Sequence, residues 1–238
     1  MEEQRKQPIA GEMTGKERLK TAASAMMSNM KLHATKKSGP MGTEERTDEK
    51  LVRDILDVWP STPKLVAETM VKFYGQPNEA MLNRMTWYNN GPWKRTVVFP
   101  DQIPHDFPEP HVDCLEQTID YHVPAEKVGL VGQVDGSVII DRTKGEISAH
   151  CDNEGANTLS MNMVHDVVTG KRTPEEAREF IKNEMVEYLM NRPAPYAERF
   201  QFELPKGNQW DTDKTVIQDK VLSEAVNKVK ETLGLDKE

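Results

Sequence analysis

The chain has 238 residues and a formal net charge of −8, an acidic balance that argues against nucleic-acid binding, which normally needs a clustered basic surface. No apolar run approaches the ~20 residues of a membrane-spanning helix, and the first residues lack a secretory-signal pattern, so we expect a cytoplasmic protein without a membrane span. Cys114 and Cys151 are too few for a disulfide framework, and the sequence does not decide whether they are bridged.

Residues 1–47 have the composition of a polar tail. They hold nine Lys or Arg against six Asp or Glu, and they contain no aromatic residue, so they offer little with which to build a core. Leu19, Ala23, Met26 and Met30 nevertheless form a short apolar stripe at helical spacing. We predict a flexible or disordered tail with nascent helix, and helix formation against a partner is the alternative.

Two helices open the domain that we predict for residues 48–205. Apolar residues between 51 and 59 lie on one helical face, and Pro60 ends this helix because a residue before proline is pushed out of the α region. In the next helix Thr62 is the predicted N-cap, and Gly75 suits the left-handed position that follows the last turn.

A β-hairpin and a proline-rich segment come next. Residues 82–88 and 93–99 are the predicted strands, and Asn89-Asn90-Gly91-Pro92 is the turn, where Asn and Gly tolerate positive φ. The four prolines of residues 100–110 predict an ordered surface loop without regular structure.

Beyond this loop the apolar spacing of residues 112–121 predicts a short helix. Residues 137–142 and 146–151 then form the clearest predicted hairpin, with Thr143-Lys144-Gly145 as its turn. The two hairpins would supply the sheet.

Two amphipathic helices follow, at residues 156–169 and 174–191. Gly170 is the expected C′ residue of the first helix, and Thr173 with Glu176 predicts a capping box at the start of the second. The sequence thus predicts an α+β fold, a small antiparallel sheet built from hairpins and packed against helices on one face.

The C-terminal part is more polar. Residues 200–204 alternate like a last strand, residues 206–213 read as a linker, and residues 214–238 predict an amphipathic helix. A narrow apolar seam on this helix would dock on the domain or drive self-association; it consists of Leu222, Val226, Val229 and Leu233.

Several motifs resemble a prokaryotic domain family of unknown function. They are Gly91-Pro92-Trp93-Lys94-Arg95, His105-Asp106-Phe107-Pro108-Glu109-Pro110-His111-Val112-Asp113, Asp135-Gly136-Ser137-Val138 and His165-Asp166. The resemblance covers about residues 59–189 and implies domain limits but no activity.

Candidate ligand-binding residues gather in the proline-rich segment and at the hairpins. Rigid proline loops can present side chains to a ligand, and guanidinium and ammonium groups bind small anions. The candidates are Trp93, Lys94, Arg95, His105, His111, Asp113, Arg142 and His150. The competing interpretation is that these groups face water or form local ion pairs.

Metal and nucleotide sites are weakly indicated. His111, Cys114, His150 and Cys151 offer nitrogen and sulfur ligands for zinc, but adjacent strand residues such as His150 and Cys151 point to opposite faces. At best three of them, such as His111, Cys114 and His150, would share one ion, with Asp113 or Asp152 as the fourth ligand. We therefore predict no metal site, and no cofactor, since residues 129–132 lack a phosphate-binding glycine pattern.

The sequence favours a binding domain without catalysis, whose partner is a small anionic ligand or a protein. The first alternative is a hydrolase that uses acid–base or metal chemistry around His111 and Asp113, with His150 or His165 nearby. The second is a structural subunit that self-associates through the C-terminal helix. The grouping of the histidines in space separates the first two hypotheses.

Overall fold

The computed structural model describes residues 9–11, 13–35 and 42–217, together with positions 224, 227, 228 and 231. The chain divides into two units, one of Met41–Thr212 and one of Met1–Pro40 with Asp213–Glu238. Where the sequence predicts a polar tail, the second unit contains η1 (Ile9–Gly11) and the helix α1 (Gly15–Thr35), most of whose side chains are exposed. The predicted seam of the C-terminal helix lies outside the described residues.

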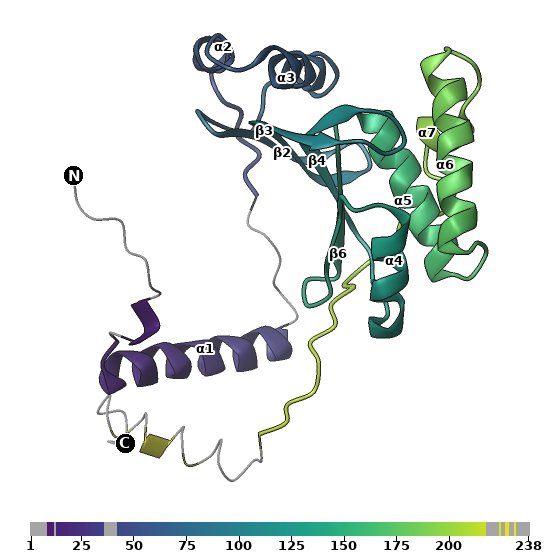
Figure 1. Ribbon diagram of the computed structural model, residues 1–238. Coiled ribbons are helices and arrows are strands. Elements are labelled where there is room, and N and C mark those ends of the chain that lie inside the picture. The colour runs from purple at the N-terminus through teal and green to yellow at the C-terminus, as the bar shows by residue number, and fades with distance from the viewer. Residues whose placement is uncertain are drawn as a thin grey trace. The chain divides into compact units, whose positions relative to one another are not determined.

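The unit Met41–Thr212 is built around one antiparallel sheet in the order β1-β2-β3-β4-β6-β5 (Figure 1). Its strands are β1 (Glu79–Met81), β2 (Arg84–Asn90), β3 (Trp93–His105), β4 (His111–Asp120), β5 (Val138–Asp141) and β6 (Glu146–Cys151). The two predicted hairpins are β2–β3 and β5–β6, and β4 joins them at the centre of the sheet.

Helices cover one face of this sheet. Those that contact strands are α2 (Glu49–Leu56), α3 (Ser61–Tyr74), α4 (Val128–Val134) and α5 (Glu154–Val168), while η2 (Ala125–Lys127), α6 (Pro174–Leu189) and α7 (Pro195–Glu198) pack on other helices. Leu115 packs with α2 and α3, and Ile119 on the same face of β4 packs with α5. The α+β prediction, with helices on one face, is therefore confirmed. No helix of the described residues is long and apolar enough to cross a membrane.

The helix ends follow the chemistry of their residues. Gly75 ends α3 with a φ of 77°, Gly170 follows α5 with a φ of 78°, and Thr173 forms the predicted capping box with Glu176 at the start of α6. The predicted N-cap Thr62 is wrong, because α3 begins at Ser61 and no side chain caps it.

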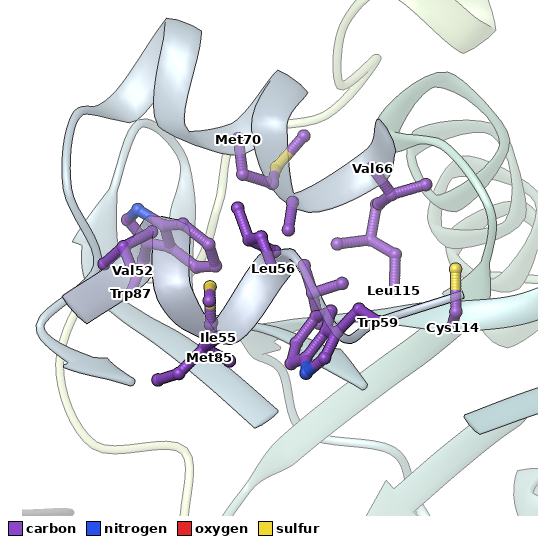
Figure 2. Close-up of a cluster of buried hydrophobic side chains, with 12 residues drawn as sticks. Val52, Ile55, Leu56, Trp59, Val66, Met70, Met85, Trp87, Cys114 and Leu115 are labelled. Carbon is purple, nitrogen blue, oxygen red and sulfur yellow. The ribbon is translucent and has the colours of Figure 1, made fainter. Parts of the chain in front are cut away.

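The cluster beneath α2 and α3 is an apolar core (Figure 2). Figure 2 shows Leu56 and Met70 from these helices in one cluster with Met85 and Trp87 of β2. Trp87 is fully buried, and its indole Nε1 donates to the carbonyl oxygen of Gly75 at 2.9 Å, so the ring has a polar partner inside the core.

The predicted helix at residues 112–121 is wrong, because this segment is β4. The apolar residues of this segment have the spacing of a helix. Leu115, Gln117 and Ile119 also occupy alternate positions, as in a strand, and all three are buried on one face of the sheet. Pairing with both β3 and β6 decides between the two patterns.

The predicted loop of residues 100–110 is also largely strand. β3 continues to His105 after a register shift between Val98 and Ile103, so only residues 106–110 form the connection to β4. This extension of β3 brings the first histidine of the proline-rich segment onto the sheet.

The predicted last strand at residues 200–204 is absent from the described part of the chain. Aromatic packing holds this segment instead: Phe200 meets Trp93 with ring centroids 5.2 Å apart, and Phe202 stacks on His165 at 4.1 Å.

Candidate metal centre

The end of the β3–β4 hairpin brings two histidines and a carboxylate together. His105 of β3 is the register partner of His111 in β4, and Ile103 is the partner of Asp113. Because alternate residues of a strand share a face, the side chains of His105, His111 and Asp113 all lie on the helix-covered face. Their nitrogen and oxygen ligand atoms are all within 4.8 Å of one another.

Asp113 lies between the two imidazoles. Its Oδ1 is 3.2 Å from Nε2 of His111, and its Oδ2 is 3.4 Å from Nδ1 of His105. The two imidazole rings are themselves 4.8 Å apart between centroids. Two ligand atoms on a tetrahedral zinc ion lie roughly 3.3 Å apart, given Zn–N and Zn–O bonds of about 2.0 to 2.1 Å. The 3.2 and 3.4 Å separations are close to this edge length, but they involve different oxygens of Asp113, and the three ligand atoms span up to 4.8 Å.

Two of these atoms are buried without a hydrogen bond. His111 and Asp113 expose only 6% and 7% of their side chains, and neither Nε2 of His111 nor Oδ1 of Asp113 has a hydrogen-bond partner among the described residues. Their 3.2 Å separation permits attraction but lacks hydrogen-bond alignment. Buried polar atoms normally have such a partner, so this pair calls for a chemical explanation.

A backbone contact orients His111. Its Nδ1 lies 2.7 Å from the carbonyl oxygen of Glu109, an acceptor, so Nδ1 carries the proton that is donated in this contact. Nε2 is then the nitrogen that faces Asp113, and it offers a lone pair to a metal ion once its own proton has left. Metal-binding histidines usually donate their other N–H to such an oxygen.

A second layer of polar groups holds the other ligands. Ser137 donates its hydroxyl to Oδ2 of Asp113, and the same hydroxyl is 3.3 Å from Nδ1 of His105. Asp135 follows α4 and lies 3.8 Å from Nε2 of His105, while Ser160 of α5 donates to it at 2.7 Å. The cluster is thus anchored to β3, β4, α4 and α5.

His111 and Asp113 each stabilise the charged form of the other. The Asp113 carboxylate and, next, the neighbouring Cys151 raise the pKa of His111 to about 11. Burial raises the pKa of Asp113, but His111 and the Ser137 hydroxyl outweigh burial and hold this pKa below its usual value. A buried anionic ligand atom is therefore present at neutral pH.

His150 does not join this cluster. It pairs in register with Glu116, which places both on the opposite face of the sheet, with Nε2 of His150 3.3 Å from Oε2 of Glu116. His165 is elsewhere again, bonded through Nδ1 to the hydroxyl of Tyr121 at 2.9 Å. The set His111, Cys114 and His150 therefore does not converge.

The basic candidates are already paired. Lys94 binds Asp120 and Glu146 at 2.5 and 2.9 Å, and Arg95 binds Glu146 at 3.1 Å. Arg142 pairs with Asp211 across the β5–β6 turn, where a Cβ at Gly145 would collide with the backbone of Gln209. The cations predicted to hold an anion are thus neutralised by acids.

Trp93 is also a structural residue, since it is 1% exposed and packs in the core. A groove of about 690 Å³ does exist, but it lies between α3 and the start of α5 rather than beside the proline-rich hairpin. Its lining includes Leu65, Phe73 and Tyr188, and none of the predicted site residues.

The sequence interpretation missed Asp135, Ser137 and Ser160. Asp135 and Ser137 belong to the Asp135-Gly136-Ser137 segment, whose sequence is typical of a turn. The structure contains this turn, in which the backbone N–H of Ser137 donates to Oδ1 of Asp135 at 2.9 Å. Only the fold reveals that the same two side chains face the histidines.

The fold and the cluster define an α+β domain with a candidate two-histidine, one-carboxylate metal centre. Comparison with protein-family models, with curated proteins and with solved structures found no match to this chain. The resemblance to a prokaryotic family of unknown function therefore stays a prediction.

Proposed function

We propose that the unit Met41–Thr212 is a metal-ion-binding domain that holds one divalent transition-metal ion through His105, His111 and Asp113. The observation that carries this proposal is the buried pair of Nε2 of His111 and Oδ1 of Asp113, 3.2 Å apart and without hydrogen-bond partners among the described residues. An ion between them would satisfy both atoms at once.

The donor set indicates the class of ion. Imidazole nitrogens suit zinc, iron, copper and nickel, whereas magnesium and calcium prefer all-oxygen surroundings. Two imidazoles and one carboxylate therefore favour Zn²⁺ or Fe²⁺ over Mg²⁺ or Ca²⁺.

The sequence favoured a ligand-binding protein, and this proposal agrees with that class of function. The proposed ligand, however, is a metal cation rather than a small anion. The cations meant for a small anion are paired with acids, whereas the histidine cluster is suited to a cation. The hydrolase alternative needs an open coordination position for water on the same ion. Both cysteines are free thiols, which suits the reducing cytoplasmic compartment that we also propose.

Calorimetric titration of Zn²⁺ into chelator-treated full-length protein tests the proposal. We expect one equivalent to bind, and Asp113→Asn to weaken binding by more than about 100-fold, because removing a ligand exceeds the 10 to 100-fold effect of an outer-shell change. Glu116→Gln is the matched control, since Glu116 also lies next to a histidine at 3.3 Å. Equal loss in both variants, or no binding to the wild type, would refute the proposal.

A further inference from the structure

Cys151 lies beside the histidine cluster and on the same face of the sheet. It ends β6 and is the register partner of Leu115 in β4. Leu115 shares its face with Asp113, two positions away, so Cys151 and Asp113 are diagonal neighbours on adjacent strands. The thiol therefore belongs to the side of the sheet that carries the candidate ligands.

The Cys151 thiol is buried and adjacent to His111. The residue is 8% exposed, and its thiol interacts with the His111 side chain. Its Sγ is also 3.7 Å from Oδ1 of Asp152, which is a weak contact. Sγ is not among the ligand atoms that lie within 4.8 Å of one another, so coordination by Cys151 requires its side chain to turn toward the cluster.

We propose that Cys151 supplies the fourth ligand of the metal centre, which makes it a closed tetrahedral site of two histidines, one aspartate and one cysteine. This inference rests on the proposed function. As the sulfur–metal bond forms, the S–H bond breaks and its proton passes to the buffer. The expected occupant is Zn²⁺, because thiolate and imidazole ligands in a tetrahedral set select it over harder ions.

A fourth protein ligand changes what the site can do. Structural zinc sites have four protein ligands, whereas catalytic sites keep one position for water or substrate. With Cys151 bound, the ion cannot activate water for hydrolysis. The inference therefore favours a stabilising or metal-sensing role over the hydrolase alternative.

Cys114 offers the matched control. It is the other cysteine of the chain, it is also buried, and burial raises the pKa of its thiol to about 12. However, it packs in the apolar cluster with Leu115 and Val98 (Figure 2). Replacing it tests the general effect of losing a buried thiol.

Cobalt titration of full-length protein, kept reduced with a phosphine, distinguishes the two cysteines. We expect the Co²⁺ complexes of wild type and Cys114→Ser to show a near-ultraviolet thiolate-to-cobalt charge-transfer band. Cys151→Ser should lose this band and bind Co²⁺ at least about tenfold more weakly through the remaining three ligands. Far-ultraviolet circular dichroism verifies folding, and Cys151→Ala provides a second variant without any ligand atom.

The outcomes separate the inference from the proposal beneath it. A wild-type cobalt complex without the charge-transfer band overturns the role of Cys151 but leaves the three-ligand site standing, and this result needs no variant. A band that survives in Cys151→Ser and Cys151→Ala overturns it as well. If wild-type protein binds neither Co²⁺ nor Zn²⁺, the proposed function itself fails.

Discussion

Two histidine–carboxylate pairs lie on opposite faces of the same sheet, and their separations are nearly equal. His111 and Asp113 are 3.2 Å apart on the helix-covered face, and His150 and Glu116 are 3.3 Å apart on the other. The first pair exposes 6% and 7% of its side chains, whereas the second exposes 27% and 18%.

The surroundings of the two pairs differ more than their distances do. His105, Ser137 and Cys151 surround the first pair with further nitrogen, oxygen and sulfur atoms. The second pair lies beside Ser148, which hydrogen-bonds Thr118 at 2.9 Å in a polar ladder across the strands. Nε2 of His150, like Nε2 of His111, is buried without a hydrogen-bond partner among the described residues. A short histidine–carboxylate distance and an unpaired imidazole nitrogen are therefore common to both pairs, and the first pair differs in its lower side-chain exposure and in the further ligand groups around it.

The largest expected difference between the pairs is the stabilisation by metal. At a Zn²⁺ concentration 100 times the wild-type dissociation constant, binding should stabilise the fold by ~2.7 kcal/mol. His150→Ala should keep this increment, whereas His111→Ala, with about 100-fold weaker binding, should retain only ~0.4 kcal/mol. Thermal unfolding with and without Zn²⁺ measures the stabilisation of each variant. Equal stabilisation of His150→Ala and His111→Ala would contradict the assignment of His111 as a ligand.

An intermediate effect is expected from the serines that flank the pairs. Ser137→Ala removes the hydroxyl that donates to Asp113, so Zn²⁺ affinity should fall about tenfold, or ~1.4 kcal/mol. Ser148→Ala, on the opposite face, should leave the affinity unchanged. Competition with a zinc indicator dye measures this, and an unaltered affinity in Ser137→Ala would mean that the hydroxyl does not orient the ligand.

The smallest effect concerns Glu116 and the pH. Burial raises the pKa of Glu116, but hydrogen bonds from His150 and Ser148 outweigh it, so the folded-state pKa lies below the ordinary value of 4.5. Its charged form therefore stabilises the fold above pH 4.5, and this contribution is lost as the pH falls through the folded-state pKa. Glu116→Gln should cost less than about 1 kcal/mol at pH 7, and the difference from wild type should shrink in acid.

Urea unfolding at neutral and acidic pH checks this prediction. A difference between wild type and Glu116→Gln that stays constant with pH would show that the carboxylate charge contributes nothing. Unlike Asp113→Asn, this variant should bind Zn²⁺ normally.

The sequence predicted the parts of the fold that short-range chemistry controls. Gly75, Gly170 and the capping box at Thr173 fix chain ends through local φ angles and hydrogen bonds, and turn residues such as Gly145 fix the second hairpin. These features depend on a few neighbouring residues, which the sequence displays directly.

The sequence could not settle β4, and the site depends on β4. The spacing of Leu115 and Ile119 suits both a helix and a strand, and only pairing with β3 and β6 selects the strand. Once β4 is a strand, His105 faces His111 in register and Asp113 joins them. His105, His111 and Asp113 were candidates because they lie in the proline-rich segment, whereas Asp135 and Ser137 reach them only through the tertiary fold.

The location of bound zinc tests the central claim most directly. Crystals of the full chain grown with one equivalent of Zn²⁺ should give a single anomalous difference peak at the zinc edge, between Nε2 of His111 and the carboxylate of Asp113. A peak beside His150 and Glu116 instead, or no ordered zinc at His111, would contradict the account.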